Sequence, residues 1–315
     1  MSWDPQALPD LTGRTFAVTG GNAGVGYFIT EQLAAAGARV VILGRDPGRL
    51  DLAVRAVRDR VPEALLTTVA LDLADLESVA LAAAELNRLD RLDALIENAG
   101  VTQPGRKRRT TRQGFELAVG TNHLGHFALT ALAMPVLSAT PGSRVVPMGS
   151  MITKMIRFDL GDLQSERSYG QYHAYAQSKH AVQIFGIELD RRLRAAGTGM
   201  RAVIAHPGFA VDSSAPRREG INEPAALARL SAHLLAPMAH GKDRGAWPAV
   251  RAAADPDAPG GAFYGPARDL FPGAARVPRE HQVAEIDRDP ELGTRLWDLS
   301  QKLTGVEFPL PAARP

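Results

Sequence analysis

Cysteine is absent from this sequence of 315 residues, which excludes disulfide bonds, thiol catalysis and cysteine-ligated metal sites. Long hydrophobic runs are absent as well, since no stretch approaches the roughly 20 apolar residues that a membrane-spanning helix needs. The first five residues, from Met1 to Pro5, lack the basic and apolar segments of a secretory signal. Together these absences predict a cytoplasmic protein without a membrane span.

A large excess of charge of one sign is also missing. The formal net charge is only +2, so the sequence does not indicate a nucleic-acid partner. The one concentrated basic run is Arg106 to Arg109, with Arg112 close by. We interpret it as a solvated loop, with contact to an acidic substrate or a carrier protein as the alternative. The 45% apolar content fits a globular protein, and we predict a single domain over residues 1–315.

Short apolar strands alternate with helical patterns over the first two thirds of the chain. A strand at 15–18 leads into a glycine-rich turn and then into a helix that ends at Gly37. Further strands are expected at 39–43, 65–71, 94–96, 144–146 and 201–205, with helices at 73–89 and 122–137. This alternation predicts an α/β, Rossmann-type doubly wound parallel sheet of about seven strands with helices on both faces. After Pro207 the pattern weakens, and residues 208–242 are expected to form a C-terminal substrate lid, with a helix near 225–235.

The glycine-rich turn predicts a nucleotide site. Gly20, Gly24 and Gly26 lie between the first strand and the first helix, where glycine lets the backbone approach a pyrophosphate and the helix N-terminus favours negative charge. The alternative is a tight turn that needs glycine for its backbone angles alone. At the end of the second strand, Gly44 and Arg45 stand where an NAD-selective site has a carboxylate, which favours the 2′-phosphate of NADP. Asp46 turning inward, or a merely solvated Arg45, remains the alternative.

Tyr175 and Lys179 lie four residues apart and share one face of a helix, so the ammonium can sit beneath the phenol and favour its ionised form. Such a pair is also common on solvated helix surfaces. With the glycine turn, Asn122 and Ser150 preceding it in the chain, however, the pair indicates a redox site.

These motifs, taken in order, resemble the short-chain dehydrogenase/reductase family from Thr12 to about Phe308. The resemblance rests on residues 19–26, 98–100, Asn122, Ser150, Tyr175 and Lys179. Residues 122–127, 205–208 and 264–266 resemble the retinol-dehydrogenase-like branch and its bacterial relatives.

The resemblance implies roles for individual residues. Tyr175 would be the proton donor or acceptor, and Ser150 would bind the substrate oxygen. Lys179 would bind the nicotinamide ribose and lower the pKa of Tyr175, while Asn122 would help to hold a water that links Lys179 to solvent. The cofactor-binding set would comprise Gly20, Asn22, Gly24, Val25, Gly26, Arg45, Asp72, Leu73, Asn98, Ala99, Gly100, Tyr175, Lys179, Pro207 and Gly208. No metal site is expected, because His123 and His126 lack a third ligand.

Four features depart from the family pattern. Glu97 replaces the first Asn of Asn-Asn-Ala-Gly, and Pro147 removes a ladder donor just before Ser150, so that displacement of the Ser150 loop is expected. Asp212 and Ser213 follow Pro207-Gly208 where the family has a threonine for the nicotinamide carboxamide. Finally, an insertion after Ser150 carries apolar residues that either line the substrate pocket or pack the loop down, namely Met151, Met155, Ile156, Phe158 and Leu160.

The sequence as a whole predicts an NADP-dependent oxidoreductase that reduces a ketone or aldehyde of a hydrophobic substrate, or runs the reverse oxidation. One alternative is a redox-neutral isomerase, dehydratase or cyclase, which Asp212 and the unusual approach to Ser150 motivate. Another is a non-catalytic protein that senses NADP or binds a partner, which the intact set of four residues argues against. A homo-oligomer with its seam on the helices that begin at Asn122 and Tyr175 is a family expectation.

Overall fold

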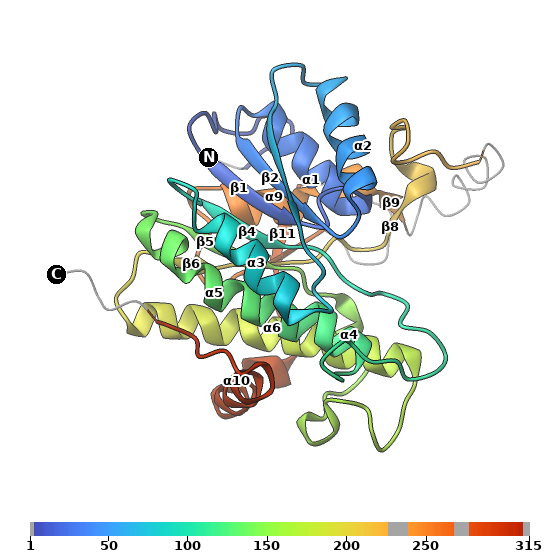
Figure 1. Ribbon diagram of the computed structural model, residues 1–315, viewed down its shortest axis with the longest axis vertical. Coiled ribbons are helices and arrows are strands. Elements are labelled where there is room, and N and C mark those ends of the chain that lie inside the picture. The colour runs from blue at the N-terminus through green and yellow to red at the C-terminus, as the bar shows by residue number, and fades with distance from the viewer. Residues whose placement is uncertain (1–2, 226–238, 268–276, 311–315) are drawn as a thin grey trace.

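The computed structural model describes residues 3–225, 239–267 and 277–310 (Figure 1). Its main sheet has six parallel strands in the order β3-β2-β1-β4-β5-β6, which confirms the Rossmann-type prediction. The order reverses between β1 and β4, so the crevice at the carboxyl ends of these two strands is where such folds bind ligands. The six strands are β1 (Thr15–Thr19), β2 (Arg39–Gly44), β3 (Leu65–Ala70), β4 (Ala94–Glu97), β5 (Arg144–Pro147) and β6 (Arg201–Ala202).

The strand predicted over 201–205 is divided at Val203. Its second part, β7 (Ile204–Ala205), pairs in parallel with β10 (Phe263–Gly265) in a second, three-stranded sheet. A bridge between Met148 and Ala205 joins this sheet to the end of β5. An antiparallel edge strand, β11 (Arg279–His281), then pairs with β10. The prediction of about seven strands is therefore roughly right. The sequence of β11 is polar throughout and has no strand pattern, but charged side chains are typical of an edge strand because they discourage pairing with another chain.

Helices cover both faces of the sheet, as predicted. On one face, Phe16 and Val18 pack against α1 (Gly24–Ala35), α2 (Pro47–Arg58) and α9 (Trp247–Ala254). On the other, Ala17, Val41 and Leu95 share a core with α3 (Leu76–Leu86), α5 (Gly125–Ala139) and α6 (Gln171–Ala195). Successive residues of β1 thus serve opposite cores, because side chains alternate along a strand. Burial on both faces explains why the central strands read as continuous apolar runs.

The last helix, α10 (Pro290–Thr304), lies against α6 on the side away from the sheet (Figure 1). Its Trp297 contacts Phe127 of α5 and Phe185 of α6, with ring centroids 5.4 and 5.9 Å apart. This helix therefore covers part of the surface on which the subunit seam was expected. The homo-oligomer remains a prediction.

The chain beyond Pro207 crosses back to the α1 side of the molecule. There β8 (Ala210–Val211) pairs in parallel with β9 (His240–Gly241), and Arg218 binds Glu31 of α1 through two contacts of 2.6 and 2.7 Å. The helix expected near 225–235 lies almost wholly outside the described residues, so the lid remains a prediction. Among the helices in the described ranges, none combines the length and the apolar character that crossing a membrane requires.

Candidate active site

The glycine turn between β1 and α1 is shaped so that only glycine fits. Gly20 and Gly24 have φ angles of +63° and +56°, in the left-handed region. A Cβ on Gly26 would lie 2.3 Å from the carbonyl oxygen of Gly20 and 2.4 Å from Nδ2 of Asn98. The turn is thus a cradle that a side chain would fill, and it opens at the N-terminus of α1 beside Val25. These residues fit the diphosphate of a dinucleotide.

The segment that follows β4 is hydrogen-bonded to the end of β1, where this turn begins. Asn98 donates from Nδ2 to the carbonyl of Thr19 at 2.9 Å, and the backbone N–H of Ala99 donates to Oγ1 of Thr19 at 3.0 Å. Gly100 lies against Asn122, since a Cβ there would be 3.0 Å from Oδ1 of that residue. The structure therefore brings residues 98–100 together with the glycine turn at the point where the strand order reverses.

At the end of β2, the side chain of Asn22 occupies the space beside Gly44. A Cβ on Gly44 would lie 2.7 Å from Oδ1 of Asn22, so a carboxylate-bearing residue does not fit there without movement. Arg45 is exposed. Asp46 does not turn inward, because its Oδ1 accepts the backbone N–H of Arg49 at 3.0 Å and caps α2. Of the two charged residues after Gly44, Asp46 is engaged as a helix cap and Arg45 is exposed, so Arg45 is the one available to bind a ligand.

The remaining predicted cofactor residues follow β3 and β7 of the sheets. Asp72 accepts the backbone N–H of Ala74 through Oδ1 at 3.0 Å, a local turn role, and Leu73 is buried against Gly125 of α5. Pro207 and Gly208 follow β7, and the carbonyl of Pro207 accepts a hydrogen bond from Nε2 of His240 at 2.7 Å. That bond attaches the turn after β7 to β9.

Asn122 lies in a π-helical turn, η1 (Gly120–Leu124), that interrupts the helix expected over 122–137. Such turns occur frequently at functional sites. Its Nδ2 donates to the carbonyl of Val101 at 3.0 Å and to Oγ of Ser178 at 2.9 Å, while its Oδ1 accepts the N–H of Val101 at 2.7 Å. Asn122 thus joins the segment after β4 to the helix that carries Tyr175 and Lys179.

Ser150 is not carried away from Tyr175 by Pro147, contrary to the expectation of a displaced loop. Pro147 ends β5 opposite Glu97, and Gly149 restores pairing by donating its N–H to the carbonyl of Ala205 at 2.8 Å. Burial raises the pKa of Tyr175, and the nearby Ser150 side chain partly offsets that rise. One of the two observations that motivated a redox-neutral reaction therefore has a structural explanation.

Lys179 lies over the ring of Tyr175, with Nζ 5.9 Å from the ring centroid. The ammonium donates to the carbonyl of Met148 at 2.7 Å rather than to the phenol. Burial raises the pKa of Tyr175, so the lowering by Lys179 stays a prediction. Spacing along the helix correctly placed the two side chains on one face but did not show which acceptor the ammonium would find.

The family model of the short chain dehydrogenases matches residues 14–220, the segment that contains every catalytic and cofactor-binding residue predicted from the sequence. This chain belongs to the short-chain dehydrogenase family. The match ends at residue 220, before β9 and the C-terminal helices. For the remaining third of this dehydrogenase, similarity to known proteins comes from individual relatives and not from the family model.

Two curated relatives match most of the dehydrogenase. Polyprenol dehydrogenase of Mus musculus is 36% identical over 310 residues, covering 96% of this chain and 87% of the relative. Retinol dehydrogenase 13 of Homo sapiens is 32% identical over 313 residues, covering 97% and 88%. These similarities support the retinol-dehydrogenase-like branch predicted from the sequence.

Solved structures agree on the fold. An uncharacterised protein from Mycobacterium paratuberculosis has a TM-score of 0.78 at 33% identity, covering 98% of this chain and 100% of that chain. An NADPH-bound short chain oxidoreductase from Pseudomonas aeruginosa PAO1 has a TM-score of 0.61 at 20% identity, covering 81% and 95%. The second likeness shows the fold alone.

Glu97 is the first departure of this dehydrogenase from the family pattern, and its side chain is buried near Lys179. Its Oε1 accepts a hydrogen bond from Oγ1 of Thr130 at 2.5 Å, and burial raises its pKa to about 7. Burial lowers the pKa of Lys179 to about 8, and the charge of Glu97 opposes that change. The nearby His126 stays neutral, since burial lowers its pKa to about 4. Glu97 is thus a carboxylate whose charge acts on Lys179.

Replacing Glu97 by Gln should move the pH profile of the dehydrogenase. The carboxylate favours the charged ammonium, so its removal lowers the pKa of Lys179 further. The alkaline limb of kcat/KM is then expected at a lower pH, by roughly one unit. Glu116→Gln is the matched control, because Glu116 is also buried with a raised pKa but has Arg108 as its cationic neighbour. Superimposable alkaline limbs in wild type and Glu97→Gln would contradict this role.

A buried polar network that the sequence did not indicate holds the loop of Ser150. Gln183 accepts the N–H of Ser150 at 2.9 Å and donates from Nε2 to Oδ2 of Asp287 at 2.7 Å. The other carboxylate oxygen of Asp287 lies 2.5 Å from Nδ1 of His180, whose Nε2 donates to the carbonyl of Ile156 at 2.7 Å. Asp287 is over 100 residues from its partners, which leaves no local signal in the sequence.

Other features noted in the sequence have local structural roles. Within the basic run, Arg108 donates to the carbonyl of Gln164 at 2.9 Å and Arg112 pairs with Asp75 at 2.7 Å. Phe158 is buried in a small core with Leu163, whereas Met155 is 83% exposed, so the insertion after Ser150 packs down in part.

The two histidines weighed as metal ligands point to different partners. Nε2 of His123 lies 2.7 Å from Oγ of Ser300, and Nε2 of His126 lies 2.9 Å from Oγ1 of Thr19. Both rings are buried, which lowers the pKa of His123 to about 3.

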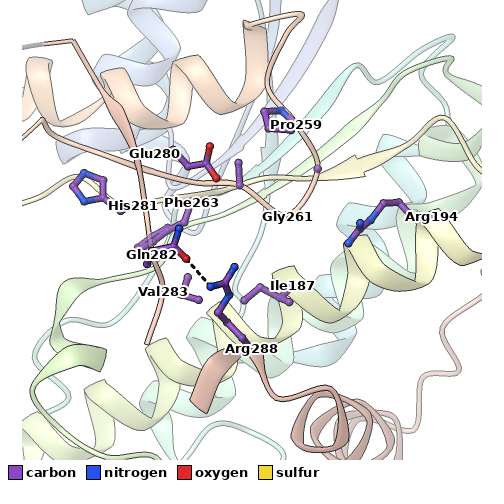
Figure 2. Close-up of a pocket in the computed structure, with 12 residues that line it drawn as sticks. Ile187, Arg194, Pro259, Gly261, Phe263, Glu280, His281, Gln282, Val283 and Arg288 are labelled. Atoms are coloured by element: carbon purple, nitrogen blue, oxygen red, sulfur yellow. Dashed lines mark hydrogen bonds between the residues drawn. The ribbon is translucent and has the colours of Figure 1, made fainter. Parts of the chain in front are cut away.

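A cavity of about 320 Å³ lies elsewhere, between α6, the turn before β10 and the segment around β11 (Figure 2). Ile187 and Arg194 border it from α6, and Arg288 crosses it to bond Gln282 at 2.6 Å. None of the predicted site residues lines this cavity. It is therefore separate from the candidate active site.

Proposed function

We propose that this dehydrogenase transfers hydride between NADP and a carbonyl or alcohol group of a hydrophobic substrate. The observation that carries the proposal is the position of Lys179 over the ring of Tyr175, beside Ser150, in a chain that also has the glycine cradle. The names of the relatives support the substrate class, because polyprenol and retinol are both apolar alcohols.

In this proposal the nicotinamide, when bound, supplies or accepts the hydride, and the chain's own residues handle the oxygen and its proton. Tyr175 gives its proton to the carbonyl oxygen during reduction, and its raised pKa keeps the phenol protonated at neutral pH. Ser150 hydrogen-bonds the same oxygen as negative charge develops on it. Lys179 would hold the nicotinamide ribose, and Asn122 keeps the helix of Lys179 joined to the segment after β4.

Two observations support NADP over NAD. The space beside Gly44, where NAD-selective sites place a carboxylate, is taken by Asn22, and Asp46 is used as a helix cap. Arg45 is left exposed next to them, where a guanidinium suits a 2′-phosphate. The cytoplasmic location, the single domain and the lid at 208–242 remain predictions from the sequence.

The test is to follow NADPH absorbance with purified protein and a panel of long-chain aldehydes and ketones, and to repeat it with NADH. Wild type is expected to prefer NADPH. Arg45→Asp should lower kcat/KM with NADPH by roughly 10- to 100-fold, because charge-assisted hydrogen bonds to the 2′-phosphate are lost, while NADH is affected little. Arg60→Asp, at an exposed position beyond α2, makes the same charge change as a control.

Equal use of NADPH and NADH by wild type, or an Arg45→Asp variant that keeps its NADPH activity, would contradict the cofactor assignment. Tight NADPH binding without oxidation by any member of the panel would favour the redox-neutral or sensing alternatives.

A further inference from the structure

Lys242 is a cation from outside the family-matched segment that lies at the glycine turn. It is the first residue of α8 (Lys242–Gly245), and its Nζ is 3.6 Å from the position that a Cβ on Gly24 would occupy. Gly24 stands at the N-terminus of α1, in the cradle that fits a dinucleotide diphosphate. A lysine of the C-terminal third of the chain therefore points at the place where the phosphates of the cofactor are expected.

The backbone at Lys242 is held in place by contacts on both sides. Gln32 of α1 donates from Nε2 to the carbonyl of Asp243 at 2.7 Å. Gly241 pairs with Val211 in the short sheet of β8 and β9, and a Cβ on Gly241 would lie 2.6 Å from the carbonyl oxygen of Ser214. The side chain of Lys242 is only 24% exposed. The fold therefore fixes the position of Lys242 near Gly24, and its side chain is not freely solvated.

The ammonium of Lys242 is at present paired with Asp212. Nζ lies 2.7 Å from Oδ1 and 2.8 Å from Oδ2 of that carboxylate, which is 54% exposed. Exposed ion pairs contribute little net stability, whereas a lysine hydrogen-bonded to a phosphate oxygen gains the attraction of a more strongly charged group. Exchange of one acceptor for the other is therefore favourable once a diphosphate is in the cradle.

The ion pair also affects the charge of Asp212. A carboxylate beside the cofactor would repel the phosphates, and its occurrence after Pro207-Gly208 was the second observation that motivated a redox-neutral reaction. Lys242 neutralises that charge only while the ion pair is formed, so after the exchange Asp212 is an exposed carboxylate that weakens diphosphate binding.

We propose that Lys242 is a cofactor-binding residue that exchanges Asp212 for the diphosphate of the dinucleotide. The exchange would attach β9 and α8 to the bound cofactor. The inference rests on the proposed dinucleotide binding but not on the choice of NADP, because NAD and NADP share the diphosphate.

The test measures dissociation constants by isothermal titration calorimetry for three probes. NADPH and ADP-ribose contain the diphosphate, whereas adenosine 2′-phosphate does not. Lys242→Gln is expected to weaken NADPH and ADP-ribose by the same factor, about tenfold, and to leave adenosine 2′-phosphate unchanged. Asp212→Asn should tighten the first two probes a few-fold, because Lys242 no longer has to leave an ion pair. Lys302→Gln, at an exposed position on α10, is the control and should change nothing.

The outcomes separate this inference from the proposed function. If wild type binds NADPH and ADP-ribose and Lys242→Gln binds them equally well, Lys242 is only a structural partner of Asp212 and the inference is overturned. A loss that extends to adenosine 2′-phosphate would also overturn it, since the variant would then have damaged the whole site. Failure of wild type to bind either diphosphate probe would instead refute the proposed function itself.

Discussion

Tyr175→Phe is expected to lower kcat for carbonyl reduction by roughly 10³-fold while the dissociation constant of NADPH stays within about twofold of wild type. General acid catalysis typically contributes 10²- to 10⁴-fold, and phenylalanine removes the phenolic proton that Tyr175 is proposed to deliver. The ring itself is kept, so its contact with Lys179 changes little. The effect should therefore fall on the chemical step and spare cofactor binding.

A matched control is available on the same helix. Tyr172 lies one turn before Tyr175 in α6 but is 65% exposed, so Tyr172→Phe makes the same chemical change away from the site. Steady-state turnover and NADPH fluorescence titration would be measured for both variants. If Tyr175→Phe kept more than about a tenth of wild-type turnover, another group would have to be the proton donor.

The fold was largely predictable because its central strands are buried on both faces. Apolar runs such as 39–43 and 94–96 are long enough to be recognised without alternation, and the helices between them require parallel pairing. The break at Val203 and the edge strand β11 were not predictable. Val203 donates its N–H to the carbonyl of Val145 at 2.9 Å, whereas the next residue pairs with the turn before β10, so the division depends on two different neighbours.

The candidate site was predictable where one residue type is imposed locally. Gly20 and Gly24 need left-handed backbone angles, and Gly26 allows a close approach, so the glycine pattern itself carries the information. The groups that act on these motifs from a distance were not predictable. Lys242 approaches Gly24 from more than 200 positions along the chain, and the direction of the ammonium of Lys179 is decided by the carbonyl of Met148. Only the packed structure brings such partners together.

Asp287→Ala should produce the largest loss of stability, roughly 3–5 kcal/mol in the free energy of unfolding. Asp287 is 1% exposed and bonds both His180 and Gln183, so alanine leaves two buried polar groups without their partner. Gln183 in turn accepts the N–H of Ser150. Turnover should therefore fall as well, even in the fraction of protein that remains folded.

Asp287→Asn separates the hydrogen bonds from the charge. The carbonyl of Ile156 can only accept, so Nε2 of His180 carries a proton in either state of the pair. An Asn amide can then donate to Nδ1 of neutral His180 and accept from Gln183, which preserves both bonds. The Asn variant is expected to lose less than about 1.5 kcal/mol and to keep most of its turnover.

The stability comparison is made by urea unfolding at neutral pH, with Glu285→Ala as the control. Glu285 lies in the same short 3-10 helix as Asp287 (Glu285–Arg288) but is exposed, so its removal should change the free energy of unfolding by less than about 0.5 kcal/mol. Equal stabilities of Asp287→Ala and Glu285→Ala would show that the network does not hold the Ser150 loop. A variant Asp287→Ala that is destabilised but turns over normally per folded molecule would restrict Asp287 to stability, because a residue that positions Ser150 must also affect kcat.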